Sequence, residues 1–226
     1  MSVAPIYPLK RPRTLTEQAA EAIRSRIVNG EFQLGEALSE ITLAGELGVS
    51  KTPVREAFLQ LKNEGLVDIQ PQRGTFVFQM TSEQVRQLTV LRELLEMEAL
   101  RIAMRGDRRR LAEILNDIMA QMERAVAVGD SALYRALDND LHQHIIMASG
   151  NQFIEAAYSS IAFRVQALRN RLSQRPPEND RSLQEHRELV ELVNANDSEG
   201  AVAKLLEHIR ATLRAYIGFV EATSRG

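Results

Sequence analysis

Four residues in the C-terminal part of the chain have the types and spacing of a metal-binding set. Asp138 and His142, in DNDLHQH, are four residues apart, so a helix places both side chains on one face. His186 lies in SLQEHRELVELV and His208 in KLLEHIRATL, each in a separate helical pattern. One carboxylate and three imidazoles from three helices of one bundle would suit Zn²⁺, and also Ni²⁺, Mn²⁺ or Fe²⁺.

The spacing alone leaves an ordinary interpretation open. A lone helical histidine is commonly a surface or hydrogen-bonded core residue, and an Asp–His pair four apart is commonly a hydrogen bond on a helix surface. His144 projects about 200° around the helix from His142, so we expect it on the surface. The chain has no cysteine, so disulfides are excluded and only nitrogen and oxygen could hold a metal.

A second candidate site lies in GVSKTPVREAFLQLKNEGLV, residues 48–67. On a helix capped by Ser50, one side is apolar and is predicted to be buried; it comprises Val54, Phe58, Leu59 and Leu61. The other side of the first turns carries Lys51, Thr52 and Arg55. A core helix needs no cations there, whereas a recognition helix carries cations and hydroxyls at the end that enters the DNA major groove.

These residue types suit contacts with DNA. Arginine can pair with guanine O6 and N7, lysine does so less rigidly, and serine or threonine can bond a base or a phosphate. The free amides at the start of the helix add a phosphate site. Arg73, beside Gly74 at the tip of a predicted hairpin, is placed for phosphate or minor-groove contact. Residues 1–13 form a basic arm with Lys10, Arg11 and Arg13. The alternative is a solvated helix with ordinary surface charges.

Composition places limits on both interpretations. The 226 residues, 44 % of them apolar, suffice for one large domain or two modest ones. No apolar run approaches the roughly 18 residues that span a bilayer, and MSVAPIYPLKRPR lacks the apolar centre of a secretory signal, so we expect a soluble cytoplasmic protein. The net charge is −2. Bulk charge therefore does not indicate nucleic-acid binding, and a DNA interpretation depends on where the charges lie.

The pattern predicts two blocks. In residues 1–80 we expect three helices followed by a β-hairpin, which is the order of a winged helix-turn-helix. The helices are predicted over 14–30, 39–47 and 51–64, and the strands are LVDIQ and TFVFQ around PQRG. From Thr81, residues 81–226 read as an all-α bundle of six or seven helices, and the short span favours six. The fold class is therefore mainly α.

The first block resembles a known family. GEALSEITLAGELGVSKTPVREAFLQLKNEGLVDIQPQRGTFV is similar to the winged helix-turn-helix of the GntR family of bacterial transcription regulators. The resemblance implies DNA contacts by a set of six residues: Ser50, Lys51, Thr52, Arg55, Arg73 and Gly74. Two positions depart from the family pattern, because arginine is common where this chain has Lys51 and frequent where it has Ile41. The base preference of relatives therefore does not transfer.

The second block resembles the FCD ligand-binding domain of the FadR-like subfamily. The matching stretches are LRELLEMEALRIA, DNDLHQHIIMASGN and EHRELVELVNANDSEGAVAKLLEHI. The resemblance implies that Asp138, His142, His186 and His208 bind a divalent metal, with Zn²⁺ expected. It also implies a small carboxylate effector that chelates the metal and pairs with an arginine. The candidates are Arg92, our first choice because LRELLE matches a pocket-facing family stretch, with Arg135, Arg164 and Arg169.

The resulting hypothesis is a homodimeric repressor that binds a near-palindromic operator and is released by a small organic acid. One alternative is a regulator whose metal is structural or is itself the effector. Another is a helical metalloenzyme, for which no extra general base is evident. A third is an acyl-CoA sensor, but relatives of that type lack the metal histidines. The expected protein is not an enzyme.

Overall fold

The N-terminal block is built from three helices that bury one apolar side each. The computed structural model describes residues 13–172 and 176–223. Helix α1 spans Leu15–Val28, α2 spans Glu40–Leu47 and α3 spans Lys51–Asn63. Thr14 and Glu17 form a capping box at the start of α1, and Ser39 caps α2 through the amide of Thr42. These local signals set the helix starts where the sequence predicts them.

A small antiparallel sheet completes this block. Its order is β1-β3-β2, with β1 at Ala37–Leu38, β2 at Val67–Gln70 and β3 at Gly74–Val77. In the central strand, Thr75 lies opposite Leu38 on one side and Ile69 on the other. The hairpin of β2 and β3 is the predicted wing. Strand β1 was not predicted, because two residues are too short to show an alternating pattern.

Six helices form the second block within the described residues, which agrees with the lower of the two predicted numbers. They are α4 at Ser82–Arg105, α5 at Arg108–Ala127, α6 at Ser131–Ala148, α7 at Gln152–Leu172, α8 at Pro176–Asn194 and α9 at Ser198–Thr223. Thr81 and Gln84 form a capping box before α4. The central helix α4 packs against α6, α7 and α9, and α8 lies between α5 and α9. Among the helices described, none is long and apolar enough to cross a membrane.

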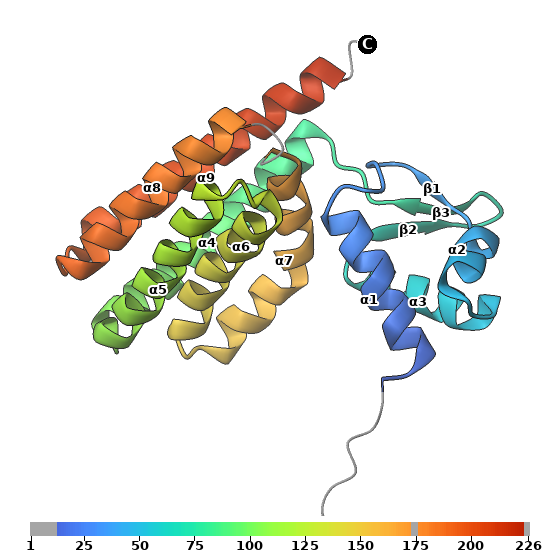
Figure 1. Ribbon diagram of the computed structural model, residues 1–226, viewed down its shortest axis with the longest axis horizontal. Helices are drawn as coiled ribbons and strands as arrows, with labels where there is room; N and C mark the ends of the chain where they lie inside the picture. The colour runs from blue at the N-terminus through green and yellow to red at the C-terminus, as the bar shows by residue number, and fades with distance from the viewer. Residues whose placement is uncertain (1–12, 173–175, 224–226) are drawn as a thin grey trace, which may run out of the picture.

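Helix α7 lies on the side of the bundle that faces the winged helix-turn-helix (Figure 1). It packs against α1 as well as against α4, α6 and α9. The mainly α fold, with three helices and a hairpin followed by an all-α bundle, is confirmed. One predicted packing detail is wrong: the side chain of Leu59 is 54 % exposed, because it lies one turn after Arg55 on the outer face of α3, opposite the buried residues Val54 and Leu61.

Candidate functional site

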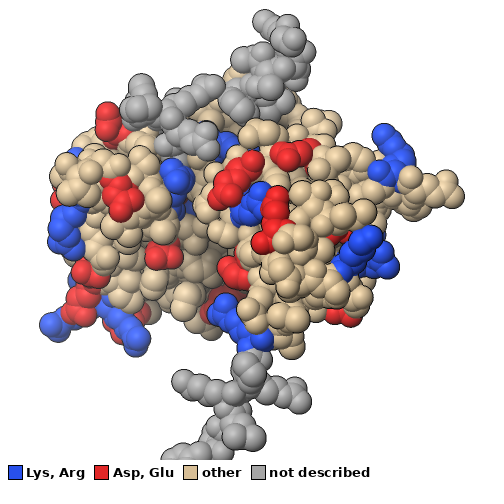
Figure 2. Space-filling model, turned by 45° about the vertical axis from the view of Figure 1, so that its right-hand side comes forward, with Lys and Arg blue, Asp and Glu red and all other residues tan. Residues whose placement is uncertain are grey.

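The start of α3 presents polar groups to the outside. Ser50 occupies the N-cap position, yet its side chain makes no capping hydrogen bond, so its hydroxyl remains available to a phosphate or base. Lys51 and Thr52 follow in the first turn and are exposed, while Val54 and Phe58 are buried below them. Figure 2 shows positive side chains projecting from the right-hand edge of the molecule, which the winged helix-turn-helix forms. The geometry fits the predicted insertion of α3 into a major groove.

Arg55 is exposed but is already ion-paired in this structure. Its Nη2 donates to Glu40 Oε2 at 2.8 Å and its Nε donates to Glu40 Oε1 at 3.2 Å. This two-pronged hydrogen bond lowers the pKa of Glu40, so the carboxylate stays charged. Glu40 lies in the first turn of α2, and the pair therefore ties the two helices of the helix-turn-helix together. The side chain of Arg55 remains 67 % exposed, so it is open to DNA.

The wing tip has the expected cation and a backbone that requires glycine. Arg73 is exposed in the turn between β2 and β3, where its amide donates to the Gln70 carbonyl at 3.1 Å. Gly74 has φ +112°, a left-handed conformation that side chains rarely adopt. Of the predicted basic arm, Arg13 is exposed, whereas Lys10 and Arg11 lie outside the described residues.

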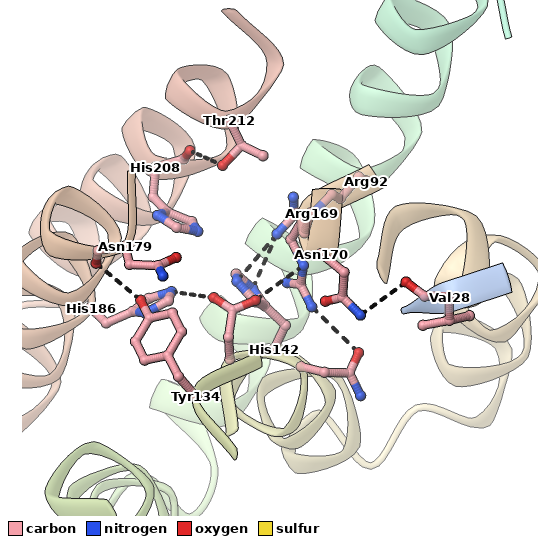
Figure 3. A network of polar contacts seen from close by, with 12 residues as sticks. Val28, Arg92, Tyr134, His142, Arg169, Asn170, Asn179, His186, His208 and Thr212 are labelled. Carbon is pink, nitrogen blue, oxygen red and sulfur yellow. Dashed lines mark hydrogen bonds and ion pairs between the residues drawn. The ribbon is translucent and has the colours of Figure 1, made fainter. Parts of the chain in front are cut away.

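The structure brings all four predicted metal ligands together inside the bundle. Figure 3 labels the three histidines of this cluster. One ligand atom from each of Asp138, His142, His186 and His208 lies within 4.8 Å of all the others, and all four residues are buried. The rings of His186 and His208 are 4.5 Å apart between centroids. Asp138 and His142 come from α6, His186 from α8 and His208 from α9. His144, by contrast, bonds the backbone of Asp140 and stays outside the cluster.

Two carboxylates orient two of the histidine rings by contacting their Nδ1 atoms. Glu96 Oε2 lies 2.7 Å from His142 Nδ1, and Glu185 Oε2 lies 2.7 Å from His208 Nδ1. When Nδ1 donates to a carboxylate, the lone pair is left on Nε2, as in metal sites. Neither Nε2 of His208 nor either ring nitrogen of His186 has a hydrogen-bond partner among the described residues. Asp138 Oδ1 lies 3.6 Å from His186 Nε2, which is beyond hydrogen-bond distance. Buried nitrogens without hydrogen bonds are costly, so this cluster fits a divalent cation better than it fits a closed protein core.

The protonation states also match a metal site. Burial lowers the pKa of His186 and of His208 to about 3 in each case, and the pKa of His142 is likewise well below its ordinary value because of burial. For Asp138, burial acts to raise the pKa, but Arg169 and the three histidines together hold it well below its usual range. Three neutral imidazoles and one carboxylate are therefore ready to bind a cation without first losing protons.

Three of the four predicted effector arginines lie at the cluster or at the cavity beside it. Arg92 Nη2 is 3.3 Å from the ring nitrogens of His142, while its Nε donates to Glu96 at 2.5 Å. Arg169 Nε lies 3.3 Å from Asp138 Oδ2. A cavity of about 30 Å³ adjoins the cluster, and its lining includes Tyr134, Arg135, Asp138, Arg169, Asn170 and His208. This volume holds water but is too small for an organic acid without rearrangement.

Arg164 does not join the other three arginines. Its guanidinium lies against Gly65, at the end of α3, so close that a Cβ at Gly65 would collide with it. It also lines a cavity of about 570 Å³ between the wing and the start of α4. On α7, the side chain of Arg164 is directed toward the winged helix-turn-helix, whereas that of Arg169, five residues later, faces the bundle interior. The structure thus places Arg164 at the contact between the two blocks and away from the metal cluster.

Residues 15–77 match the description "Bacterial regulatory proteins, gntR family", and residues 87–211 match "FCD domain". The chain belongs to the GntR family of transcription regulators with an FCD domain. It is 29 % identical to a probable D-xylose utilization operon repressor of Paenarthrobacter nicotinovorans, over 89 % of this chain and 88 % of that protein. It is 26 % identical to the gluconate operon repressor of Bacillus subtilis, over 80 % and 76 %. A solved metal-free FCD domain superposes with TM-score 0.57 and 27 % identity, covering 64 % of this chain and 99 % of that domain.

This GntR-type protein is therefore a DNA-binding transcription regulator and not an enzyme. Sequence reasoning selected the four residues that cluster here, but it missed the carboxylates that contact their rings, Glu96 and Glu185, and the partner of Arg55, Glu40. A helical glutamate four residues from an arginine, as Glu96 is from Arg92, reads as an ordinary surface pair. Only its complete burial marks it as part of the site.

Proposed function

We propose that the chain is a repressor that leaves its operator when a small organic acid binds at a metal held by Asp138, His142, His186 and His208. The observation that carries this proposal is the buried cluster of four ligand atoms within 4.8 Å, backed by two carboxylates. Zn²⁺ is the expected metal, and Ni²⁺, Mn²⁺ or Fe²⁺ suit the same donors. Bound there, the metal would supply a cationic centre that an effector carboxylate can chelate.

The protein's own arginines would hold the other side of the effector. Arg169 and Arg92 are buried beside the cluster and offer guanidinium groups that pair with a carboxylate in two-pronged fashion. Arg135 lines the same cavity, whereas the position of Arg164 does not support its proposed role. One relative is named as the repressor of a gluconate operon, and gluconate is a sugar acid, which is consistent with a small acid.

On DNA, residues 1–80 would act as the binding domain and residues 81–226 as the effector and dimerisation domain. Ser50, Lys51, Thr52 and Arg55 would contact a major groove, while Arg73 and Gly74 would follow the backbone beside it. A near-palindromic operator requires two copies. The exposed apolar residues Val90, Leu91 and Leu94 on α4 support a homodimer through this helix. We expect the regulator to act in the bacterial cytoplasm, where its operator lies.

A second candidate is a regulator that responds to the metal itself. The observation that favours it is the small cavity beside the cluster, about 30 Å³, which admits no organic acid in this conformation. In that case metal alone would change operator affinity. For the first candidate, metal would be resident, and the acid would have to displace side chains on binding, which is how its affinity could move helices.

The test begins with elemental analysis of protein purified without chelators or a histidine tag. Wild type is compared with His186→Ala and with His144→Ala, a matched control on α6 outside the cluster. We expect about one metal per chain in wild type and control and little in His186→Ala, by the donor count of the site. Operator binding is then titrated with metal alone and with metal plus sugar acids or other small carboxylates. No metal in any protein after reconstitution would refute the proposed site.

A further inference from the structure

The last turn of α7 touches both the metal cluster and the winged helix-turn-helix. On the bundle side, Arg169 is 6 % exposed; its Nε lies 3.3 Å from Asp138 Oδ2 and its Nη2 lies 3.4 Å from Asn139 Oδ1. The next residue, Asn170, lines the cavity beside the cluster. The backbone of consecutive residues in one helical turn moves together, so a backbone displacement at Arg169 also displaces the two residues after it.

On the other side, Asn170 and Arg171 bond the end of α1. Asn170 Nδ2 donates to the Val28 carbonyl at 3.1 Å (Figure 3). Arg171 Nη2 donates to the carbonyls of Ile27 and Phe32, at 3.2 and 2.8 Å. The last carbonyls of a helix have no partner within the helix; the Ile27 carbonyl also accepts from the Gly30 amide at 3.2 Å, and α7 supplies the side-chain donors. Asn170 and Arg171 are 3 % and 7 % exposed, so water cannot easily replace these bonds.

The end of α1 is in turn tied to the recognition helix. Arg24, one turn earlier on α1, forms a two-pronged ion pair with Glu64 at the C-cap of α3, with both N–O distances at 2.7 Å. The same guanidinium lies 4.9 Å from the ring centre of Phe163 on α7. Thr16 also donates to Glu56 of α3 at 2.7 Å. A shift of α1 relative to the bundle therefore carries α3 with it.

We propose that Asn170 and Arg171 are positioning residues that transmit the state of the metal and effector site to the recognition helix through the end of α1. This inference rests on the proposed function, because it assigns the route by which that site regulates DNA binding. A ligand that draws Arg169 away from Asp138 turns the end of α7. The carbonyls of Ile27, Val28 and Phe32 then either move with α7 or lose the hydrogen bonds from Asn170 and Arg171. Neither residue belongs to the four proposed metal ligands or to the predicted DNA-contacting residues, so each acts through others.

Hydrogen exchange of the full-length protein tests this route. Peptides that cover residues 26–32 are followed in chelator and after loading with Zn²⁺, which is the probe. In wild type we expect Zn²⁺ to slow exchange there by at least about fivefold, the lower end of ordinary coupling between sites. In Asn170→Ala and Arg171→Lys, we expect zinc to protect the bundle as before but to leave residues 26–32 within about twofold of the chelated protein. Asn116→Ala, which removes a side-chain bond to Asn194 on the bundle surface, is the matched control and should behave as wild type.

Two results would overturn the route: unchanged exchange at 26–32 in zinc-loaded wild type, or full zinc protection there in Asn170→Ala. Zinc content of each sample is measured in parallel. If no zinc binds, the proposed function fails. The route is then tested with Arg169→Gln, which perturbs the start of the route at Arg169 without any metal. Faster exchange at 26–32 in that variant supports the route, whereas exchange equal to wild type overturns it. Asn170→Ala keeps Arg171 and the α7 packing, so the fold is retained.

Discussion

The metal-free protein should lose stability steeply as the pH falls from about 7.5 to about 5.0, because two histidines are buried in the neutral form. His186 and His208 are 0 % and 3 % exposed, and burial lowers the pKa of each to about 3. In the unfolded chain their pKa returns to about 6.5. Because the folded pKa lies below the unfolded one, the neutral form stabilises the fold fully above pH 6.5, and this stability is lost as pH falls toward 3.

The magnitude follows from the unfolded histidine alone. At pH about 5.0 the unfolded side chain is some 1.5 pH units below its pKa, which corresponds to about 2 kcal/mol for each histidine at about 1.4 kcal/mol per unit. The two together contribute roughly 4 kcal/mol, a large part of the 5–15 kcal/mol typical of a domain. This loss of roughly 4 kcal/mol does not depend on the exact pKa of the histidines in the folded protein, provided that this pKa stays below about 4. Asp138 titrates below this pH window and does not contribute to the loss.

The assay is urea unfolding at both pH values in chelator, comparing wild type with the double variant His186→Gln, His208→Gln. Groups that do not contact the two histidines change alike in the two proteins, so the difference between their pH dependences reports the two histidines together with their carboxylate partners Asp138 and Glu185. Wild type should lose roughly 4 kcal/mol more than the variant between the two pH values. Losses that agree within about 1 kcal/mol would refute the reasoning and would mean that both imidazoles are protonated or hydrated in the folded protein.

Three further predictions concern single side chains. Arg55→Ala should abolish specific operator binding in a mobility shift at low salt, since it removes the guanidinium that can read guanine, while thermal unfolding stays near wild type. Ile41→Arg should tighten operator binding and steepen its salt dependence by about one unit in slope, because Ile41 is 66 % exposed on α2 and an arginine there can reach a phosphate. Glu96→Gln should weaken metal binding roughly 10- to 100-fold in competition with a chromophoric chelator, because His142 loses the carboxylate behind it.

Each of these has a matched control. For Arg55→Ala the control is Arg187→Ala, which removes an arginine that is ion-paired to Glu123 on the bundle; the operator binding of this control should equal that of wild type. Specific operator binding that survives in Arg55→Ala would refute the assignment of Arg55. An unchanged salt slope in Ile41→Arg would show that α2 lies away from the phosphates. Glu98→Gln changes an exposed carboxylate on the same helix as Glu96 and should bind metal normally; equal affinity in both variants would contradict the orienting role of Glu96.

Local signals in the sequence were enough for the element order and for the chemical types at both sites. Apolar periodicity predicted the helices, and the structure shows side-chain caps at Thr14, Ser39 and Thr81 where three of them begin, because capping and amphipathicity act over a few residues. Spacing predicted that Asp138 and His142 share one helix face, residue types added the histidines of α8 and α9 as candidates, and the resemblance implied a metal-binding role for all four. Strand β1 was not predicted, because its two residues pair with β3 across nearly forty positions of sequence and show no alternating pattern of their own.

Only the tertiary structure decided which of the many charged residues act together. Glu96 and Glu185 read as helix-surface charges until folding buries them behind His142 and His208. Arg164 and Arg169 are equivalent by composition, yet the turn of α7 directs one toward Gly65 and the other toward Asp138. Asn170, which reads as an ordinary helix residue, bonds Val28 across 142 positions of sequence. Contacts at that separation are set by how whole helices pack, and no local pattern encodes them.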